Sequence, residues 1–209
     1  MIGIARHRIG IDGAGVTTLA CFSGCPLRCR YCLNPQCFDE ATPAMMMTPE
    51  ELYRYTAVDH LYFLASGGGV TFGGGEPLLR LPFLERFREL CGDEWHLSAE
   101  TSLHVPAEII PVAGKILNAF IVDIKDVNPV IYHSYTGGDV TVALSNLRTL
   151  LEQVGPERIC VRLPLIPGYN TEADRAHSQE LLSSLGITTF DRFTYQKRSA
   201  SKTKTTHIG

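Results

Sequence analysis

Residues 16–34 read VTTLACFSGCPLRCRYCLN, and this stretch joins two different patterns. Its first part, 16–22, is rich in apolar and β-branched residues and predicts a buried strand. The strand is followed by a loop that carries cysteines at positions 25, 29 and 32. The stretch therefore predicts a strand whose carboxyl end leads into a loop of reactive side chains.

Strand-like and helix-like segments alternate along the rest of the chain. The predicted strands cover 16–22, 70–72, 95–99, 119–124, 159–165 and 188–194, and the predicted helices cover 48–64, 77–90, 107–112, 140–154 and 171–185. Such alternation is typical of a parallel sheet with crossover helices. A complete eight-unit barrel needs about 250 residues, whereas this chain has 209. We therefore expect an α/β fold, a partial, open βα barrel of about six strand–helix units with a parallel sheet.

This barrel is predicted to form one domain over residues 1–195. The remaining residues, 196–209, read QKRSASKTKTTHIG and contain almost no apolar side chain. That composition predicts a polar, basic C-terminal tail that is solvated or disordered. A basic patch that binds a partner is the alternative interpretation of the tail.

The overall composition excludes several classes of protein. The chain is 44% hydrophobic and 20% charged, which is ordinary for a globular protein and excludes a disordered chain. Its net charge of −3 provides no general attraction for nucleic acid. No run approaches the roughly 20 apolar residues of a membrane span, and the first residues lack a signal-peptide pattern. We therefore expect a cytoplasmic protein with no membrane partner, whose seven cysteines are mostly reduced.

Polar or reactive residues follow every predicted strand. In chain order they are the cysteine loop, 73–76, 100–102, Asp123 with Lys125, 164–168 and 195–198. In parallel α/β folds ligands bind at the carboxyl ends of the strands. The sequence therefore predicts a site at this rim of the sheet.

The cysteine loop predicts an iron–sulfur site. Zinc sites usually add a second cysteine pair or a histidine pair, and neither follows here at matching spacing. Three thiolates suit three irons of a [4Fe–4S] cluster, which normally takes four cysteines, so the fourth iron could bind a small molecule. Cys21 or Cys37 could instead supply a fourth thiolate. The isolated Cys91 and Cys160 are interpreted as small buried hydrophobic residues.

Taken together, the motifs resemble the radical S-adenosylmethionine superfamily, and within it the enzymes that activate glycyl radical enzymes, such as pyruvate formate-lyase activase. The loop GCPLRCRYCLN at 24–34 is similar to the cluster loop of that family. Further similarities are DGAG at 12–15, SGGGVTFGGGEP at 66–77, DIK at 123–125, Arg162, and PG at 167–168.

The resemblance implies roles for individual residues. Cys25, Cys29 and Cys32 would bind a [4Fe–4S] cluster, at which S-adenosylmethionine is reductively cleaved to a 5′-deoxyadenosyl radical. The cofactor-binding residues would be Tyr31, Gly74, Gly75, Glu76, Glu100, Asp123, Lys125 and Arg162. Asp123 and Lys125 could instead form a plain salt bridge with each other. Arg162 could instead take part in a structural ion pair. Asp12 and Gly13 would contact the substrate.

Three positions depart from the family pattern. The family usually has DTNG where this chain has ETSL at 100–103, Ala14 replaces a proline, and Gln196 stands in place of a histidine. In the resembled activase a monovalent cation lies beside the cofactor, which here implies a cation near Glu100 and Asp123.

The resemblance also implies partners. They are a glycyl radical enzyme as protein substrate and a one-electron donor such as flavodoxin or ferredoxin. Two other functions remain open at this point. One is a radical enzyme that acts on a small molecule or nucleotide, as a deazapurine synthase does; the other is a non-catalytic iron–sulfur or zinc module.

Overall fold

The computed structural model describes residues 1–38 and 45–195. The predicted tail at 196–209 lies outside the described residues, as does Gln196. Among the described residues, no helix has the length and apolar character needed to cross a membrane.

Seven strands form one sheet in the order β1-β2-β3-β4-β5-β6-β7. Strands β2 to β7 are parallel, and β1 pairs antiparallel with β2. The strands are β1 (Gly3–Ile9), β2 (Val16–Phe22), β3 (Gly69–Gly74), β4 (His96–Thr101), β5 (Ala119–Asp123), β6 (Ile159–Leu165) and β7 (Thr189–Thr194). Since β1 and β7 are the two ends of the order, the sheet is open, and the predicted partial barrel is confirmed.

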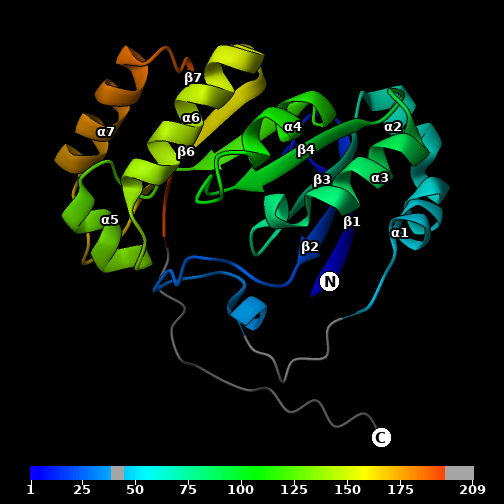
Figure 1. The fold of residues 1–209 in the computed structure, drawn as a ribbon, viewed down its shortest axis with the longest axis horizontal. Helices are drawn as coiled ribbons and strands as arrows, with labels where there is room; N and C mark the ends of the chain where they lie inside the picture. Colours follow the sequence, from blue (N-terminus) through cyan, green and yellow to red (C-terminus); the bar gives the residue numbers. More distant parts are fainter. Residues whose placement is uncertain (39–44, 196–209) are drawn as a thin grey trace, which may run out of the picture.

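Helices connect the parallel strands. They are α1 (Pro49–Thr56), α2 (His60–Ser66), α3 (Leu81–Cys91), α4 (Ile109–Ile116), α5 (Pro129–Thr136), α6 (Val140–Val154) and α7 (Glu172–Ser184). Helices α1 to α3 gather beside the first strands, and α5 to α7 gather beside the last strands (Figure 1). The start signal at residue 48 is a capping box, in which Thr48 and Glu51 cap one another's backbone.

Among the strands and α-helices, two elements were not predicted, the strand β1 and the helix α5. β1 is largely exposed along one edge, so its sequence lacks a buried alternating face. α5 has eight residues and a weakly amphipathic sequence, although Asn128 caps its start. Both elements turn out to border the predicted site.

The core lies between the sheet and the helices. Phe72, Leu97, Val122 and Val161 come from four adjacent strands and are fully buried. The single tryptophan, Trp95, packs at the amino end of β4 against rings that include Tyr53, Phe63 and Phe87. This core fixes the strands in register, so that their carboxyl ends meet at one rim.

Candidate active site

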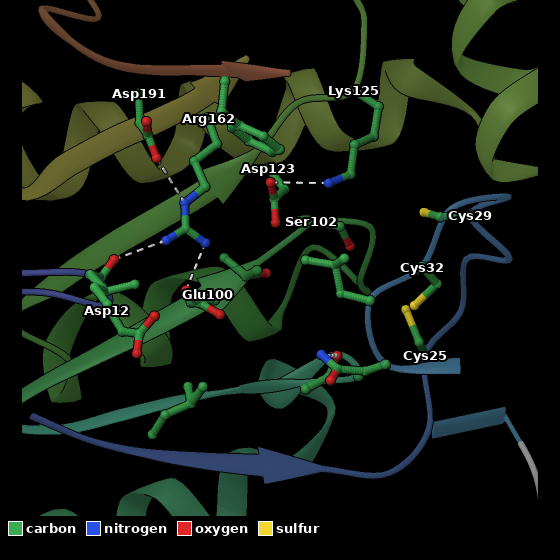
Figure 2. Close-up of a pocket in the computed structure, with 18 of the residues that line it drawn as sticks. Asp12, Cys25, Cys29, Cys32, Glu100, Ser102, Asp123, Lys125, Arg162 and Asp191 are labelled. Carbon is green, nitrogen blue, oxygen red and sulfur yellow. Dashed lines mark hydrogen bonds and ion pairs between the residues drawn. The ribbon is translucent and has the colours of Figure 1, made fainter. Parts of the chain in front are cut away.

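A cavity of about 830 Å³ opens at the carboxyl ends of the parallel strands. This volume is typical of sites that bind a small molecule or cofactor. In Figure 2 the three cysteines of the loop lie at one end of the cavity, Arg162 and Asp191 lie at the other, and Lys125 lies between them. The predicted rim residues thus line one cavity, with the exceptions given below.

The cysteine loop is anchored to the end of α5. The backbone N–H of Arg28 donates to the carbonyl of Thr136 at 2.8 Å, and that of Arg30 donates to the carbonyl of Tyr135 at 3.1 Å. The last carbonyls of a helix have no partner within the helix, so the loop supplies partners that the helix needs. The loop and α5 therefore hold each other in place.

Cys25, Cys29 and Cys32 all line the cavity, and their thiols are free. Burial raises the pKa of Cys25 to about 12 and that of Cys29 to about 11. Thiols in such surroundings become thiolates when a bound metal compensates the charge. Cys21 and Cys37, the alternative fourth ligands, do not line the cavity.

Among residues 1–38 and 45–195, no three histidine, cysteine or acidic side chains converge on one point as ligands of a single metal ion. In a [4Fe–4S] cluster each cysteine binds a different iron, so its ligands surround a larger group. Three free thiols around one end of a cavity of this size fit such a cluster.

The glycine segment at the end of β3 packs directly against the start of the cysteine loop. Gly75 N donates to the carbonyl of Phe22, and Glu76 N donates to that of Gly24, both at 2.8 Å. A Cβ atom on Gly75 would lie 2.0 Å from the Gly24 oxygen, and Gly74 has a φ of +91°. Glycine is therefore required at both positions, and it brings backbone to the cavity wall beside the cysteines.

Glu76 does not line the cavity. Its carboxylate is 1% exposed and accepts hydrogen bonds from Thr101 Oγ1 at 2.7 Å and from both the N–H and Oγ of Ser102, at 2.9 and 2.7 Å. Burial raises its pKa, while these hydrogen bonds act in the opposite direction. In the structure Glu76 ties the end of β3 to the end of β4, a partnership that sequence reasoning missed. Its predicted contact with the cofactor's amino group stays a prediction.

Asp123 and Lys125 lie together, although β5 ends at Asp123 and Lys125 follows the strand rather than sharing a strand face with it. Lys125 Nζ is 3.0 Å from Asp123 Oδ1 and donates to the hydroxyl of Tyr195 at 3.1 Å. Burial of Lys125 opposes its charge, but Asp123 and its other neighbours outweigh burial, and its pKa lies well above the usual value. Lys125 therefore keeps its charge on the cavity wall.

Arg162 joins three strands. In the sheet, Arg162 of β6 lies directly beside Asp123 of β5 on one side and beside Asp191 of β7 on the other. Its guanidinium contacts Glu100 at 2.6 Å and Asp191 at 3.2 Å, and it donates to the carbonyl of Ile11. Glu100 and Asp123, the carboxylates expected beside a monovalent cation, thus each have a cationic side chain as partner.

Asp12 lines the cavity, is buried and is ion-paired with Arg8. Its carbonyl accepts a hydrogen bond from Thr71 in β3. Gly13 follows with a φ of +136°, which an L side chain rarely adopts. The start of the motif at 12–15 is therefore held against the cavity wall. The contacts of Asp12 and Gly13 with a substrate stay predictions.

Tyr31 points away from the cavity wall, toward an aromatic cluster. Its hydroxyl donates to the carbonyl of Pro167 at 3.2 Å, and its ring meets the edges of Tyr135 and Tyr169. The segment at 164–168 thus supports the cysteine loop from behind. The role of Tyr31 in cofactor binding stays a prediction.

Tyr132 of α5 is a residue that sequence reasoning missed. It is fully buried with Leu27 and Val140, against Cys25 and Cys29. Its hydroxyl has no hydrogen-bond partner among the residues that the structure describes. A buried hydroxyl without a partner costs about 1–3 kcal/mol, so its position beside two thiols requires an explanation. The only signal in the sequence was the Asn-Pro at 128–129, a helix start.

A family model and a known enzyme both match most of the chain. The family model described as the radical SAM superfamily matches residues 19–181. The pyruvate formate-lyase-activating enzyme of Staphylococcus aureus is 32% identical over an alignment of 207 positions, which covers 95% of this chain and 82% of that enzyme.

Solved structures give the same fold. SuiB from Streptococcus suis matches with a TM-score of 0.66 and 12% identity, over 87% of this chain and 40% of SuiB. SuiB bound to S-adenosylmethionine matches with a TM-score of 0.66 and 13% identity, over 87% of this chain and 41% of SuiB. The chain spans about two fifths of SuiB, and this likeness concerns the fold alone.

Proposed function

The chain belongs to the radical SAM superfamily and, with that membership as the premise, we propose that it holds a [4Fe–4S] cluster and S-adenosylmethionine in its cavity and acts on a glycine of a partner enzyme. The observation that carries the proposal is the lining of the cavity. Three thiols, the glycine segment and three ion-paired basic side chains meet there, while Cys21 and Cys37 stay outside.

Cys25, Cys29 and Cys32 would hold the cluster and leave one iron without a protein ligand. When bound, the cluster and its cofactor supply reductive cleavage of the carbon–sulfur bond and a primary carbon radical. The protein's own contribution is to bind and orient. The backbone at Gly74 and Gly75 approaches the cavity closely and can accept hydrogen bonds from an ammonium group.

The charged residues of the cavity suit a zwitterionic, sulfonium-bearing ligand. The basic side chains are Arg8, Lys125 and Arg162, and the acidic ones are Asp12, Glu100, Asp123 and Asp191. Each basic side chain is already paired with an acidic one. Lys125 and Arg162 can therefore offer charge to a carboxylate from fixed positions, without reorganisation when the ligand binds.

The substrate proposed is a glycyl radical enzyme. The support is the activating enzyme of Staphylococcus aureus, which aligns with 95% of this chain. A one-electron donor such as flavodoxin or ferredoxin would supply the electron. The hydrogen atom would come from the glycine Cα of the partner and would end on the 5′-deoxyadenosine carbon.

The test is anaerobic reconstitution of wild-type, Cys29→Ala and Cys91→Ala protein with iron and sulfide. With dithionite and S-adenosylmethionine, the wild type and Cys91→Ala should form 5′-deoxyadenosine, and Cys29→Ala should form none. Turnover by Cys29→Ala would overturn the cluster assignment.

The substrate is tested separately. A candidate glycyl radical enzyme with deuterium at its glycine Cα should transfer deuterium to 5′-deoxyadenosine. Cofactor cleavage without deuterium transfer, from every such partner tried, would contradict the glycine as the target and leave the cluster assignment standing.

A further inference from the structure

A second, smaller pocket shares two cysteines with the cavity. Its volume is about 290 Å³, and it is lined by Arg28, Cys29, Arg30, Cys32, Pro35 and Phe38. Cys29 and Cys32 also line the cavity, at the end shown in Figure 2, whereas the other four residues do not. We call this second space the outer pocket. The two cysteines are thus reached from two sides, from the cavity and from the outer pocket.

Arg28 is fixed beside the outer pocket. Its guanidinium donates to the carbonyl of Cys25 at 2.5 Å and to that of Leu27 at 3.1 Å. It also lies over the ring of Phe38, at 4.6 Å from the ring centre, which is a favourable cation–π contact. The side chain is nevertheless exposed. The loop therefore holds one positive charge in place at the surface.

Both arginines of the outer pocket lack an acidic partner within residues 1–38 and 45–195. Arg30 is also exposed, and over the same residues its side chain makes no hydrogen bond. The basic side chains that line the cavity differ, because each of them is paired with a carboxylate. The outer pocket thus presents two positive charges that are free to pair with another molecule.

From this arrangement we infer that the outer pocket is the docking site of the electron donor, and that the donor is a protein with an acidic surface around its redox centre. The inference rests on the proposed function, because it needs a cluster held by Cys29 and Cys32. In the transfer the cluster gains one electron and the donor loses one. No bond is made or broken, and no proton moves.

The position of the outer pocket suits a donor better than it suits the protein substrate. The cavity would hold the cofactor and the glycine that is attacked, so the donor needs a separate approach to the cluster. The outer pocket gives access to two proposed ligands without passage through the cavity. Exposed charges of one sign speed the encounter with a partner of the opposite sign. Electron-transfer complexes also use small interfaces, which a pocket of this size can supply.

The test compares wild-type, Arg30→Glu, Arg30→Lys and Arg148→Glu protein after anaerobic reconstitution, with an acidic flavodoxin as the probe. Arg148 is exposed on α6 and lines neither pocket. At low salt Arg30→Glu should bind immobilised oxidised flavodoxin about tenfold more weakly than the wild type. With S-adenosylmethionine present, it should also oxidise flavodoxin hydroquinone to the semiquinone about tenfold more slowly below saturation. Arg30→Lys and Arg148→Glu should match the wild type.

Two further measurements separate docking from a structural role of Arg30. Photoreduced 5-deazaflavin is a small reductant that needs no docking site, so with it all four proteins should cleave the cofactor at the same rate. Added salt should slow the wild type with flavodoxin toward the rate of Arg30→Glu, because salt screens exposed charges. That result would also show that Asp39 and Glu40, which lie outside the described residues, do not cancel the two arginines.

Several results would overturn the inference. They are an Arg30→Glu rate with flavodoxin equal to that of the wild type, a wild-type rate that salt leaves unchanged, and an equal loss of rate with deazaflavin. Weaker binding of a glycyl radical enzyme by Arg30→Glu, with normal binding of flavodoxin, would assign the outer pocket to the protein substrate instead. If iron and sulfide analysis finds no cluster in the wild type, the proposed function itself fails and the inference fails with it. Cofactor cleavage with deazaflavin in all four proteins leaves the cluster assignment standing, whatever flavodoxin does.

Discussion

At the scale of single residues, Glu76 illustrates how a motif position can serve the fold as well as a ligand. Its carboxylate joins β3 to the segment after β4 through Thr101 and Ser102, and it also accepts from the backbone of Leu78. These donors are buried or half-buried. The residue thus fixes the spacing between two neighbouring strand ends, and with it the width of the cavity at the glycine segment.

We predict that Glu76→Ala destabilises the protein by roughly 2–4 kcal/mol, because it leaves several buried donors without an acceptor. Urea denaturation of the stripped protein at neutral pH measures the change. Glu94→Ala, at an exposed position, serves as the control and should stay within about 0.5 kcal/mol of the wild type. If Glu76→Ala lowers the free energy of unfolding by less than 1 kcal/mol, the hydrogen bonds of Glu76 contribute little to stability.

Which residues gather at the rim could be predicted, but not which of them bond to one another. Strand ends in a parallel sheet meet at one edge, so the cysteines, Glu100, Asp123 and Lys125 were expected together and do line one cavity. The bonds of Arg162 to Glu100 and Asp191 depend on strand register. Register depends on core packing across neighbouring strands, which no local pattern encodes.

At the scale of elements, α5 and the cysteine loop depend on each other. Asn128 Oδ1 accepts from the backbone of Val130 and Ile131 at the start of the helix, and the loop donates to its last carbonyls. A short helix is marginal without such contacts. A change that destabilises the start of α5 should therefore also destabilise the cysteine loop, which is bonded to the end of the helix.

We predict that Asn128→Ala lowers the stability of the stripped protein by about 1 kcal/mol and speeds the loss of iron from the reconstituted protein several-fold. Thr171→Ala removes a comparable cap from α7, at a helix that does not hold the loop. It should cost similar stability and leave iron retention unchanged. The release of iron is measured by absorbance, with a chelator that forms a coloured complex with ferrous iron. Equal release rates in the two variants would mean that α5 does not support the loop.

Strand β1 was not predicted because its sequence has no clear apolar pattern. An edge strand can do without such a pattern when its side chains form ion pairs with a neighbouring element. Arg6 binds Asp59 through two hydrogen bonds of 2.6 Å, and His7 binds it at 2.9 Å. Asp59 follows α1 and is 1% exposed. The hydrogen bond from Arg6 is the main cause that lowers the pKa of Asp59. The contact that holds β1 is therefore between side chains far apart in sequence.

This pair should make stability depend on acid pH. A carboxyl whose pKa is lower in the folded state stabilises the protein above its unfolded value of about 3.9, and this contribution is lost as pH falls through the folded pKa. Since Arg6 is a third exposed, solvent screens the pair and the effect is modest. Asp59→Asn should lower the melting temperature by about 2–4 °C at pH 7, and the difference should shrink steadily as the pH falls below the unfolded value of about 3.9. Asp93→Asn, whose side chain is fully exposed, should show no difference over the same pH range.

At the scale of the whole molecule, the open barrel could be predicted from alternation and length. Helix α6 and strand β6 have the predicted bounds, since a long amphipathic segment and a mostly apolar segment of strand length are clear signals. What the alternation could not show is how differently the two ends of the sheet are packed. The core rings around Trp95 lie at the amino end of β4, and the cavity lies at the carboxyl ends.

These two ends should respond differently to denaturant. Trp95 is 1% exposed within the aromatic core, whereas the cysteine loop is held by a few backbone hydrogen bonds to α5 and to Cys37. Segments with few buried contacts open at lower free energy than the core. In urea, the visible absorbance of the reconstituted cluster should therefore disappear at a lower concentration than the one that shifts the fluorescence of Trp95, the single tryptophan. Asn128→Ala should widen the gap by moving the absorbance transition more than the fluorescence transition. Coincident transitions in both proteins would mean instead that the loop and the core unfold as one unit, so that the site is as stable as the barrel that carries it.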